Sequence, residues 1–166
     1  MLFRSAWVTA GNEHLAEFAR RHTDRVTVLP TVVDTDACLV RSDHGRHGPL
    51  RVGWLGSDRS IDETLRPHLP MLARLRDEIG FELLVVTKPR PDLPPGIGPW
   101  RWIEWSPSVE TRIAEFLDVG LMPLVDTPFQ RGKCGAKLLQ YMAAGLPAVA
   151  SPVGVNVHLL GDGRGI

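Results

Sequence analysis

Short apolar runs alternate along the chain with longer stretches in which apolar residues recur every three or four positions. The short runs are bounded by glycine or proline and predict strands at residues 6–9, 26–29, 50–56, 81–86, 100–105, 119–122 and 148–150. The periodic stretches predict helices at residues 13–22, 61–79, 109–116 and 137–144. Strands and helices in regular alternation predict a parallel sheet covered on both faces, which is an α/β, doubly wound fold.

Residues that break or cap helices sharpen these boundaries. Asn12 stands where a helix N-cap belongs. Pro67 and Pro70 fall inside the longest periodic stretch and should kink or divide that helix. Gly80 and Gly145 are placed to end helices. Residues 88–99 and 126–135 are expected to be loops because they are rich in proline, glycine and polar residues.

Residues 31–49 show no sustained period and contain several aspartates and glycines, so they form the best linker candidate. The linker separates residues 1–30 from a larger block at residues 50–166. A doubly wound domain normally closes with further helices, whereas this sequence ends on a glycine-rich stretch at residues 161–166. We therefore expect a domain that is truncated at both ends.

Composition narrows the range of partners. The 166 residues include 19 Lys and Arg against 19 Asp and Glu, so the formal net charge is zero, which argues against a general nucleic-acid binder. Cys38 and Cys134 are far apart and form no metal-ligand pattern, although the sequence leaves a disulfide open. The start of the chain does not resemble a signal peptide, and no apolar run is long enough to span a membrane. These features predict a cytoplasmic protein.

Three loops follow the carboxyl ends of predicted strands, where open parallel sheets bind their ligands. The first, at residues 56–60, contains Gly56 and Ser57 and would let backbone N–H groups approach a phosphate. A plain turn explains that loop equally well. The second loop carries Lys88 and Arg90, which could face a diphosphate, and Arg90 is somewhat better explained as a solvated charge.

The third region, residues 126–147, carries the most information. On a helix that begins near Gly135, Lys137 and Gln140 share one face. Lys133 and Lys137 would surround the helix N-terminus, where the helix dipole already favours anions. Gln140 would lie one turn deeper and could hydrogen-bond a ribose diol. An amphipathic helix with solvated lysines is an equally simple interpretation of this region taken alone.

Together these motifs resemble a known family. Residues 118–123, the Gly132-Lys133-Cys134-Gly135 segment with Lys137, and residues 140–151 resemble the donor-site segment of retaining GT-B glycosyltransferases of family 4. Residues 11–16 are similar to the last strand–helix unit of the acceptor domain, residues 29–34 to the crossover between domains, and residues 52–57 to the opening strand of the donor domain. The resemblance covers nearly the whole chain in the right order, which is more specific than any single motif.

The resemblance implies a Rossmann-like half of a GT-B fold, with a remnant of the acceptor domain at residues 1–30, a linker at residues 31–49 and an incomplete donor-binding domain at residues 50–166. The parent would be a hexosyltransferase-type enzyme that transfers a sugar from a nucleoside diphosphate sugar to a sugar or lipid-linked acceptor. It would need no cofactor and no bound metal, and its missing acceptor domain would complete the site. Peripheral association of the parent with the inner face of the cell membrane is compatible with the same resemblance.

Site roles follow from the resemblance residue by residue. Diphosphate binding falls to Lys133, Lys137, Lys88, Gly56 and Ser57, and nucleotide or ribose binding to Gln140 and Glu110. Glu110 is equally well explained as a solvent-facing helix residue.

The sequence also departs from the family pattern. Many family members carry two glutamates at the positions of Gly132 and Gln140, and glycine cannot replace a carboxylate near the sugar. No catalytic residue is assigned, because all six histidines (His14, His22, His44, His47, His68 and His158) fall outside matching motifs.

Two other functions remain open from the sequence. The isolated chain could be a module that binds a nucleoside diphosphate and transfers nothing. It could also be an unrelated Rossmann-type enzyme such as a dehydrogenase. That reading requires Gly-x-Gly-x-x-Gly after a strand, and Gly53 and Gly56 do not supply the spacing.

Overall fold

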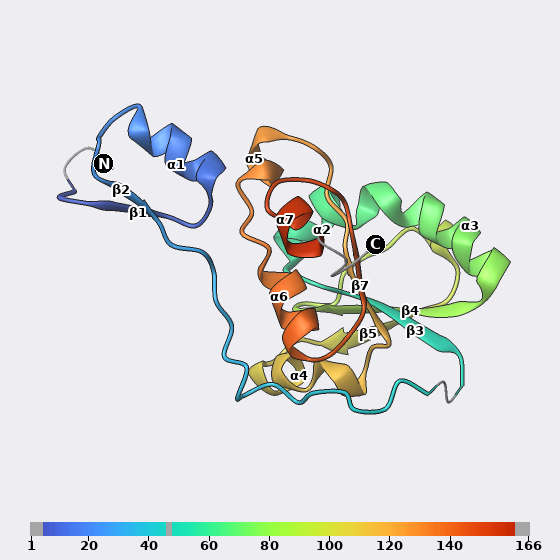
Figure 1. The fold of residues 1–166 in the computed structure, drawn as a ribbon. Coiled ribbons are helices and arrows are strands. Elements are labelled where there is room, and N and C mark those ends of the chain that lie inside the picture. Colours follow the sequence, from blue (N-terminus) through green and yellow to red (C-terminus); the bar gives the residue numbers. More distant parts are fainter. Residues whose placement is uncertain (1–4, 46–47, 162–166) are drawn as a thin grey trace.

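The computed structural model describes residues 5–45 and 48–161. The chain starts with a small N-terminal unit, which consists of β1 (Val8–Ala10), α1 (Glu13–Arg20) and β2 (Val26–Val28). The larger body contains β3 (Leu50–Leu55), α2 (Asp58–Thr64), η2 (Arg66–His68), α3 (Leu69–Ile79), β4 (Phe81–Thr87), η3 (Pro95–Ile97), β5 (Trp100–Glu104), α4 (Pro107–Thr111), η4 (Ile113–Glu115), β6 (Val119–Met122), α5 (Pro128–Arg131), α6 (Ala136–Ala143), β7 (Ala148–Ala150) and α7 (Asn156–Leu160). Figure 1 shows the N-terminal unit beside this body, joined to it by a long segment whose described residues form no helix or strand.

The main sheet has five strands in the order β5-β4-β3-β6-β7, and every neighbouring pair is parallel. The chain winds outward from β3 to β5, crosses back to β6 and continues to β7. The winding direction therefore reverses between β3 and β6, which makes their carboxyl ends the topological switch point. This arrangement confirms the doubly wound, Rossmann-like α/β fold predicted from the sequence.

Alternate residues of the central strands enter two separate cores, one on each face of the sheet. Leu84 and Val86 of β4 pack with Leu138 and Tyr141 of α6. Leu83 and Val85, which point to the opposite face, pack in the core that α2 and α3 cover. Strands buried on both faces need near-continuous apolar sequence, which explains the unbroken run in β4.

The helical stretch that follows β3 is divided where the prolines predicted. α2 ends at Thr64, the turn η2 contains Pro67, and α3 carries Pro70 in its first turn. Proline is tolerated there because the first turn of a helix has no intrahelical partner for the missing N–H. Gly80 ends α3 with a φ of 68°, a conformation that glycine adopts without strain.

Three parts of the chain differ from the sequence-based expectation in their helices. Residues 126–135 contain α5 rather than a continuous loop, because Thr127 caps the Gln130 N–H and Pro128 occupies the first helical turn. The helix predicted at residues 109–116 begins earlier and is broken at Arg112 into α4 and η4. α7 follows β7 and was not anticipated, and residues 162–166 of the predicted terminal stretch lie outside the described residues.

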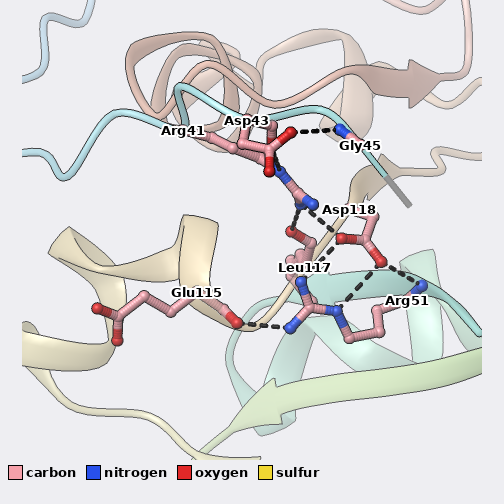
Figure 2. A network of polar contacts seen from close by, with 7 residues as sticks. All are labelled: Arg41, Asp43, Gly45, Arg51, Glu115, Leu117 and Asp118. Atoms are coloured by element: carbon pink, nitrogen blue, oxygen red, sulfur yellow. Dashed lines mark hydrogen bonds and ion pairs between the residues drawn. The ribbon is translucent and has the colours of Figure 1, made fainter. Parts of the chain in front are cut away.

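The predicted linker is anchored to the larger body near its middle. The Leu39 and Arg41 N–H groups donate to the carbonyls of Thr111 and Ala144. The Arg41 guanidinium then reaches the Asp118 carboxylate and the Leu117 carbonyl, as Figure 2 shows. Residues 39–41 are therefore packed against the larger body and held there by hydrogen bonds, although they form no helix or strand.

Candidate functional site: a cationic cavity at the switch point

A cavity of about 370 Å³ opens at the carboxyl end of β3, beside the start of α6. Its walls come from Leu55, Gly56, Ser57, Lys88, Trp105, Glu110, Ala136, Lys137 and Gln140. The fold thus brings together all the residues predicted from the sequence to bind a nucleotide, except Lys133. Their loops follow different strands and meet because parallel strands end at one edge of the sheet.

Gly56 forms the tight turn between β3 and α2. Its N–H donates to the Val86 carbonyl at 3.0 Å, so the turn remains tied to β4. A Cβ atom at Gly56 would lie 2.2 Å from Cη2 of Trp54. Ser57 stands at the start of α2, and the Ser60 hydroxyl donates to its carbonyl. Because Gly56 has no side chain, the Trp54 ring can pack against it, and this side of the cavity is lined by backbone.

Lys137 is the principal cation of the cavity. It is the second residue of α6, which begins after Gly135, an N-cap in the left-handed conformation with a φ of 72°. Its Nζ is 5.7 Å from the centroid of the Trp54 ring. Burial, reinforced by the nearby Lys133 and opposed by Glu110, lowers the pKa of Lys137 to about 8. A partly dehydrated ammonium group and the positive end of the helix dipole both attract an anion at this point.

Lys133 lies next to this cavity but does not line it. Its side chain is half-buried, and its Nζ is 6.0 Å from the centroid of the Phe129 ring. Burial lowers the pKa of Lys133, with Glu63 opposing the shift. The charge of Lys133 also lowers the pKa of Lys137, so the two ammonium groups act on the same region. Binding a polyanion between them would relieve both the repulsion and the lost hydration.

Glu110 joins two helices across the cavity wall. Its Oε2 accepts a hydrogen bond from Trp105 Nε1 at 2.7 Å, and its Oε1 accepts one from Gln140 Nε2 at 2.6 Å. An ionised carboxylate only accepts hydrogen bonds, so the amide nitrogen of Gln140 must face Glu110. Among the described residues no group donates to the Gln140 carbonyl oxygen, so this oxygen remains available to a ligand. The sequence analysis did not identify Trp105 as a site residue. Its position was a usable signal, because Trp105 follows β5 just as Lys88 follows the neighbouring strand β4.

Lys88 lies at the exposed rim of the cavity, and its Nζ is 3.2 Å from Glu104 Oε1. Arg90 instead lies over the Trp100 ring, with its Cζ 5.4 Å from the centroid. The structure therefore separates the two cations of this loop, and only Lys88 borders the cavity.

The described histidines do not line the cavity. His68 Nδ1 donates a hydrogen bond to the Thr64 carbonyl at 2.7 Å, and His47 lies outside the described residues. Cys38 and Cys134 are both free thiols. Within the described ranges, no group of three or more His, Cys, Asp or Glu side chains is arranged to hold a metal ion. No helix of that part of the chain has both the length and the apolar character that crossing a membrane requires.

A second hollow of about 390 Å³ lies on the α3 side of the sheet. Its walls are mostly apolar and include Leu50, Val52, Leu72, Leu75, Leu121 and Val149. His68 and Ser151 are the only polar side chains among its lining residues, so it offers few partners to phosphate or hydroxyl groups. The polar cavity at the switch point is therefore the better candidate for a nucleotide.

Comparison with solved structures identifies the class of fold. The chain resembles WaaG, a glycosyltransferase involved in lipopolysaccharide biosynthesis, with a TM-score of 0.66 and 17% identity over 93% of this chain and 46% of WaaG. It also resembles TarM from S. aureus, solved with fondaparinux, alpha-GlcNAc-glycerol and UDP, with a TM-score of 0.63 and 12% identity over 96% of this chain and 33% of TarM. The apo form of the lipopolysaccharide outer core galactosyltransferase WaaB gives a TM-score of 0.60 and 14% identity over 90% and 44% of the two chains.

These neighbours are GT-B glycosyltransferases, and the chain spans less than half of the length of each one described. No protein-family model matches the sequence, and a search of curated proteins found no match. The chain therefore has the Rossmann-like fold of one half of a GT-B glycosyltransferase.

Proposed function

We propose that this chain is the nucleotide-sugar-binding half of a retaining, family-4-type GT-B glycosyltransferase. Residues 50–166 form its donor-binding domain, residues 31–49 its linker, and residues 1–30 a part of the acceptor domain. The observation that carries the proposal is the cavity at the switch point, where Lys137 stands at the start of α6 and Glu110 is bonded to Gln140. That position in the fold is where doubly wound domains bind nucleotides.

The diphosphate of the donor lies against the start of α6 in this proposal. Lys137 and Lys133 supply positive charge, and the unpaired N–H groups of the first helical turn supply hydrogen-bond donors. Lys88 contributes from the rim, and the turn at Gly56 and Ser57 closes the opposite side. A bound diphosphate would favour the charged form of Lys137, because it restores the interactions that burial removed.

The nucleoside occupies the part of the cavity that α4 and α6 enclose. The Gln140 carbonyl oxygen accepts a hydrogen bond from a ribose hydroxyl, while its amide nitrogen remains bonded to Glu110. Glu110 orients this amide and presents its own carboxylate to the second hydroxyl of the diol. The two residues together take the role that a single glutamate has at the position of Gln140 in many family members.

Sugar transfer breaks the bond between the anomeric carbon and the β-phosphate oxygen, and the electron pair stays on that oxygen. The acceptor hydroxyl oxygen bonds to the anomeric carbon on the same face, and its proton passes to the diphosphate that is released. Negative charge therefore grows on the diphosphate, where Lys137 and Lys133 stabilise it more strongly than in the ground state. This role requires no metal or other cofactor. The acceptor site belongs to the missing part of the parent, and no residue of this chain is assigned as its base.

Binding without transfer is the second candidate function for the isolated chain. It is favoured because the chain spans less than half of the length of the glycosyltransferases that it resembles. A GT-B enzyme reacts in the cleft between two halves, so one half alone would bind a nucleotide sugar and not consume it. Measuring release of nucleoside diphosphate from bound donor distinguishes the two functions.

The proposal is tested by calorimetric titration of the chain with UDP, GDP and ADP and with a sugar conjugate of each. We expect saturable binding of one nucleotide, and a loss of at least about tenfold in affinity when Lys133→Ala and Lys137→Ala are combined. Arg74→Ala is the matched control, because Arg74 is an exposed cation on α3 away from the cavity. A folded protein that binds none of these nucleotides, or an unchanged affinity in the double variant, would show that the proposed site is wrong.

A further inference from the structure

Asn12 links the N-terminal unit to the segment that carries Lys133. Its side chain is 4% exposed and uses both ends of the amide. Oδ1 accepts a hydrogen bond from the Leu15 N–H at 2.9 Å and caps α1. Nδ2 donates to the carbonyls of Gly132 at 3.0 Å and Lys133 at 3.1 Å, across about 120 residues of sequence. One buried side chain therefore begins a helix in one unit and holds two consecutive peptides in the other.

The backbones around this bond approach closely, which distinguishes it from a loose surface contact. A Cβ atom at Gly11 would lie 2.4 Å from Cys134 Sγ, and one at Gly132 would lie 3.1 Å from Leu15 Cδ2. Cys134 Sγ is itself 3.7 Å from Asn12 Nδ2. Glycine at both positions lets the β1–α1 turn and the segment at residues 132–134 pack directly against each other.

The bond also fixes the orientation of the peptide between Lys133 and Cys134. In a trans peptide the carbonyl and the N–H point in opposite directions. With the Lys133 carbonyl held by Asn12, the Cys134 N–H points away from the N-terminal unit. Within the described residues this N–H donates to no other group. Asn12 thus sets both the starting point of the Lys133 side chain and a free backbone donor just before α6.

We propose that Asn12 is a positioning residue for the donor site, which holds the segment at residues 132–134 so that Lys133 and the start of α6 face the diphosphate. The inference rests on the proposed function, because it assigns diphosphate binding to this segment. It adds that the N-terminal unit is part of the donor site without touching the ligand. Loss of the Asn12 amide would weaken phosphate binding and leave contacts to the nucleoside intact.

Two substitutions separate this bond from the helix cap. Asn12→Ser and Asn12→Asp both retain an N-cap oxygen for α1 but lose the amide donor. The serine variant adds no charge near Lys133, whereas the aspartate variant does, so a shared effect excludes simple electrostatics. Trp7→Phe is the matched control, because it removes the Trp7 Nε1 bond to Thr27 Oγ1 inside the same unit, away from residues 132–134.

The first measurement needs no ligand. Cys134 packs against Gly11, whereas Cys38 lies in the linker, so alkylation of Cys134 relative to Cys38 reports opening of this contact. We expect both Asn12 variants to raise the relative rate at Cys134 by about fivefold or more, and Trp7→Phe to leave it unchanged. An unchanged rate in both Asn12 variants would show that Asn12 does not hold the two units together and would overturn the proposal.

The second measurement compares the nucleoside diphosphate that binds the wild-type chain with the same nucleoside without phosphates. We expect Asn12→Ser to weaken diphosphate binding about threefold to tenfold and to leave nucleoside binding unchanged. Faster alkylation of Cys134 with unchanged diphosphate affinity would overturn the positioning role. If the wild-type chain bound no nucleotide, the proposed function would fail, whereas the alkylation rates would still decide whether Asn12 holds the segment.

Discussion

Gln140 Nε2 lies 2.6 Å from Glu110 Oε1, so an amide from α6 and a carboxylate from α4 are joined at the wall of the cavity. Glu110 is also bonded to Trp105 Nε1, which fixes the carboxylate from its other side. The pair explains why an amide fits at residue 140, because it can donate to the carboxylate of Glu110. A second carboxylate at residue 140 would meet Glu110 at hydrogen-bond distance and be repelled.

Replacing Gln140 by glutamate should therefore destabilise the protein. We expect Gln140→Glu to lower the free energy of unfolding at pH 7 by about 1–3 kcal/mol, because two adjacent carboxylates cannot both be ionised without penalty. The double variant Glu110→Gln with Gln140→Glu reverses the hydrogen bond and should recover most of the loss. Urea denaturation of the wild type, the two single variants and the double variant gives the coupling free energy between the two side chains. Additive effects would show that the two side chains do not interact.

Lys137 should destabilise the unliganded protein at neutral pH. Its pKa in the folded chain is about 8, below the value near 10.4 that an unfolded chain provides. The folded state thus binds fewer protons between these values, so stability rises as the pH increases from about 8 to 10. Lys137→Met keeps the packing on Trp54 and should stabilise the protein at pH 7 by roughly 1–3 kcal/mol while flattening that rise.

The matching experiment is urea denaturation of wild type and Lys137→Met at several pH values, with nucleotide affinity measured in parallel. The variant should gain stability and lose diphosphate binding. Wild-type affinity should fall as the pH rises through about 8, because the cation that binds phosphate is lost. A variant that is less stable at pH 7 would show that the buried ammonium group is favourable in the folded chain.

Asp118 should make the larger body sensitive to acid. Its carboxylate accepts hydrogen bonds from the Arg51 N–H, from Nε and Nη2 of the same side chain, and from Arg41 Nη1 (Figure 2). The Arg51 side chain, followed by that of Arg41, holds the pKa of Asp118 well below its usual range. A lowered folded pKa stabilises the protein above the unfolded value, near pH 4, and this contribution disappears as the pH falls below it.

We expect Asp118→Asn to lower the free energy of unfolding at pH 7 by about 2–4 kcal/mol, since two largely buried guanidinium groups lose their counter-charge. The difference from wild type should shrink as the pH falls from 4 to 2. Asp62→Asn is the matched control, because Asp62 pairs with Arg66 at the exposed surface and should change stability by less than about 1 kcal/mol. Equal effects at residues 118 and 62 would contradict a special role of the network.

Most of the fold follows from local sequence signals. The strand of residues 81–87 contains an unbroken apolar run at residues 83–86, and the divided helix before it has prolines at the two points where regular geometry changes. α5 was missed although Thr127 and Pro128 carry an N-cap and first-turn signal, because the polar composition around them favoured a loop. Capping residues therefore predict a short helix in a polar segment better than hydropathy does.

The site was only partly predictable, because its internal bonds join distant parts of the chain. Strand ends and a glycine before a helix placed Gly56, Lys137 and Gln140 near one another through topology alone. No local pattern indicates that Glu110 would orient Gln140, or that Asn12 would hold the segment of Lys133. Both contacts depend on the packing of side chains from separate elements, which periodicity does not encode.

Gly120 gives a test of the packing that supports α6. The Tyr141 ring is fully buried against this glycine, and a Cβ atom there would lie 2.4 Å from the ring. The Tyr141 hydroxyl accepts from the Leu55 N–H at 3.2 Å and donates to the Leu121 carbonyl, so the ring cannot move away freely. We expect Gly120→Ala to lower the free energy of unfolding by about 3 kcal/mol, measured by urea denaturation.

Gly96→Ala is the control for this substitution, because no atom lies within 4 Å of a Cβ built at Gly96. It should change stability by less than about 0.5 kcal/mol. The steric origin is tested in a Tyr141→Leu background, where the shorter side chain leaves room and Gly120→Ala should become much less harmful. An equal loss in both backgrounds would locate the strain in the strand backbone, and the support of α6 by close contact between Gly120 and Tyr141 would have to be abandoned.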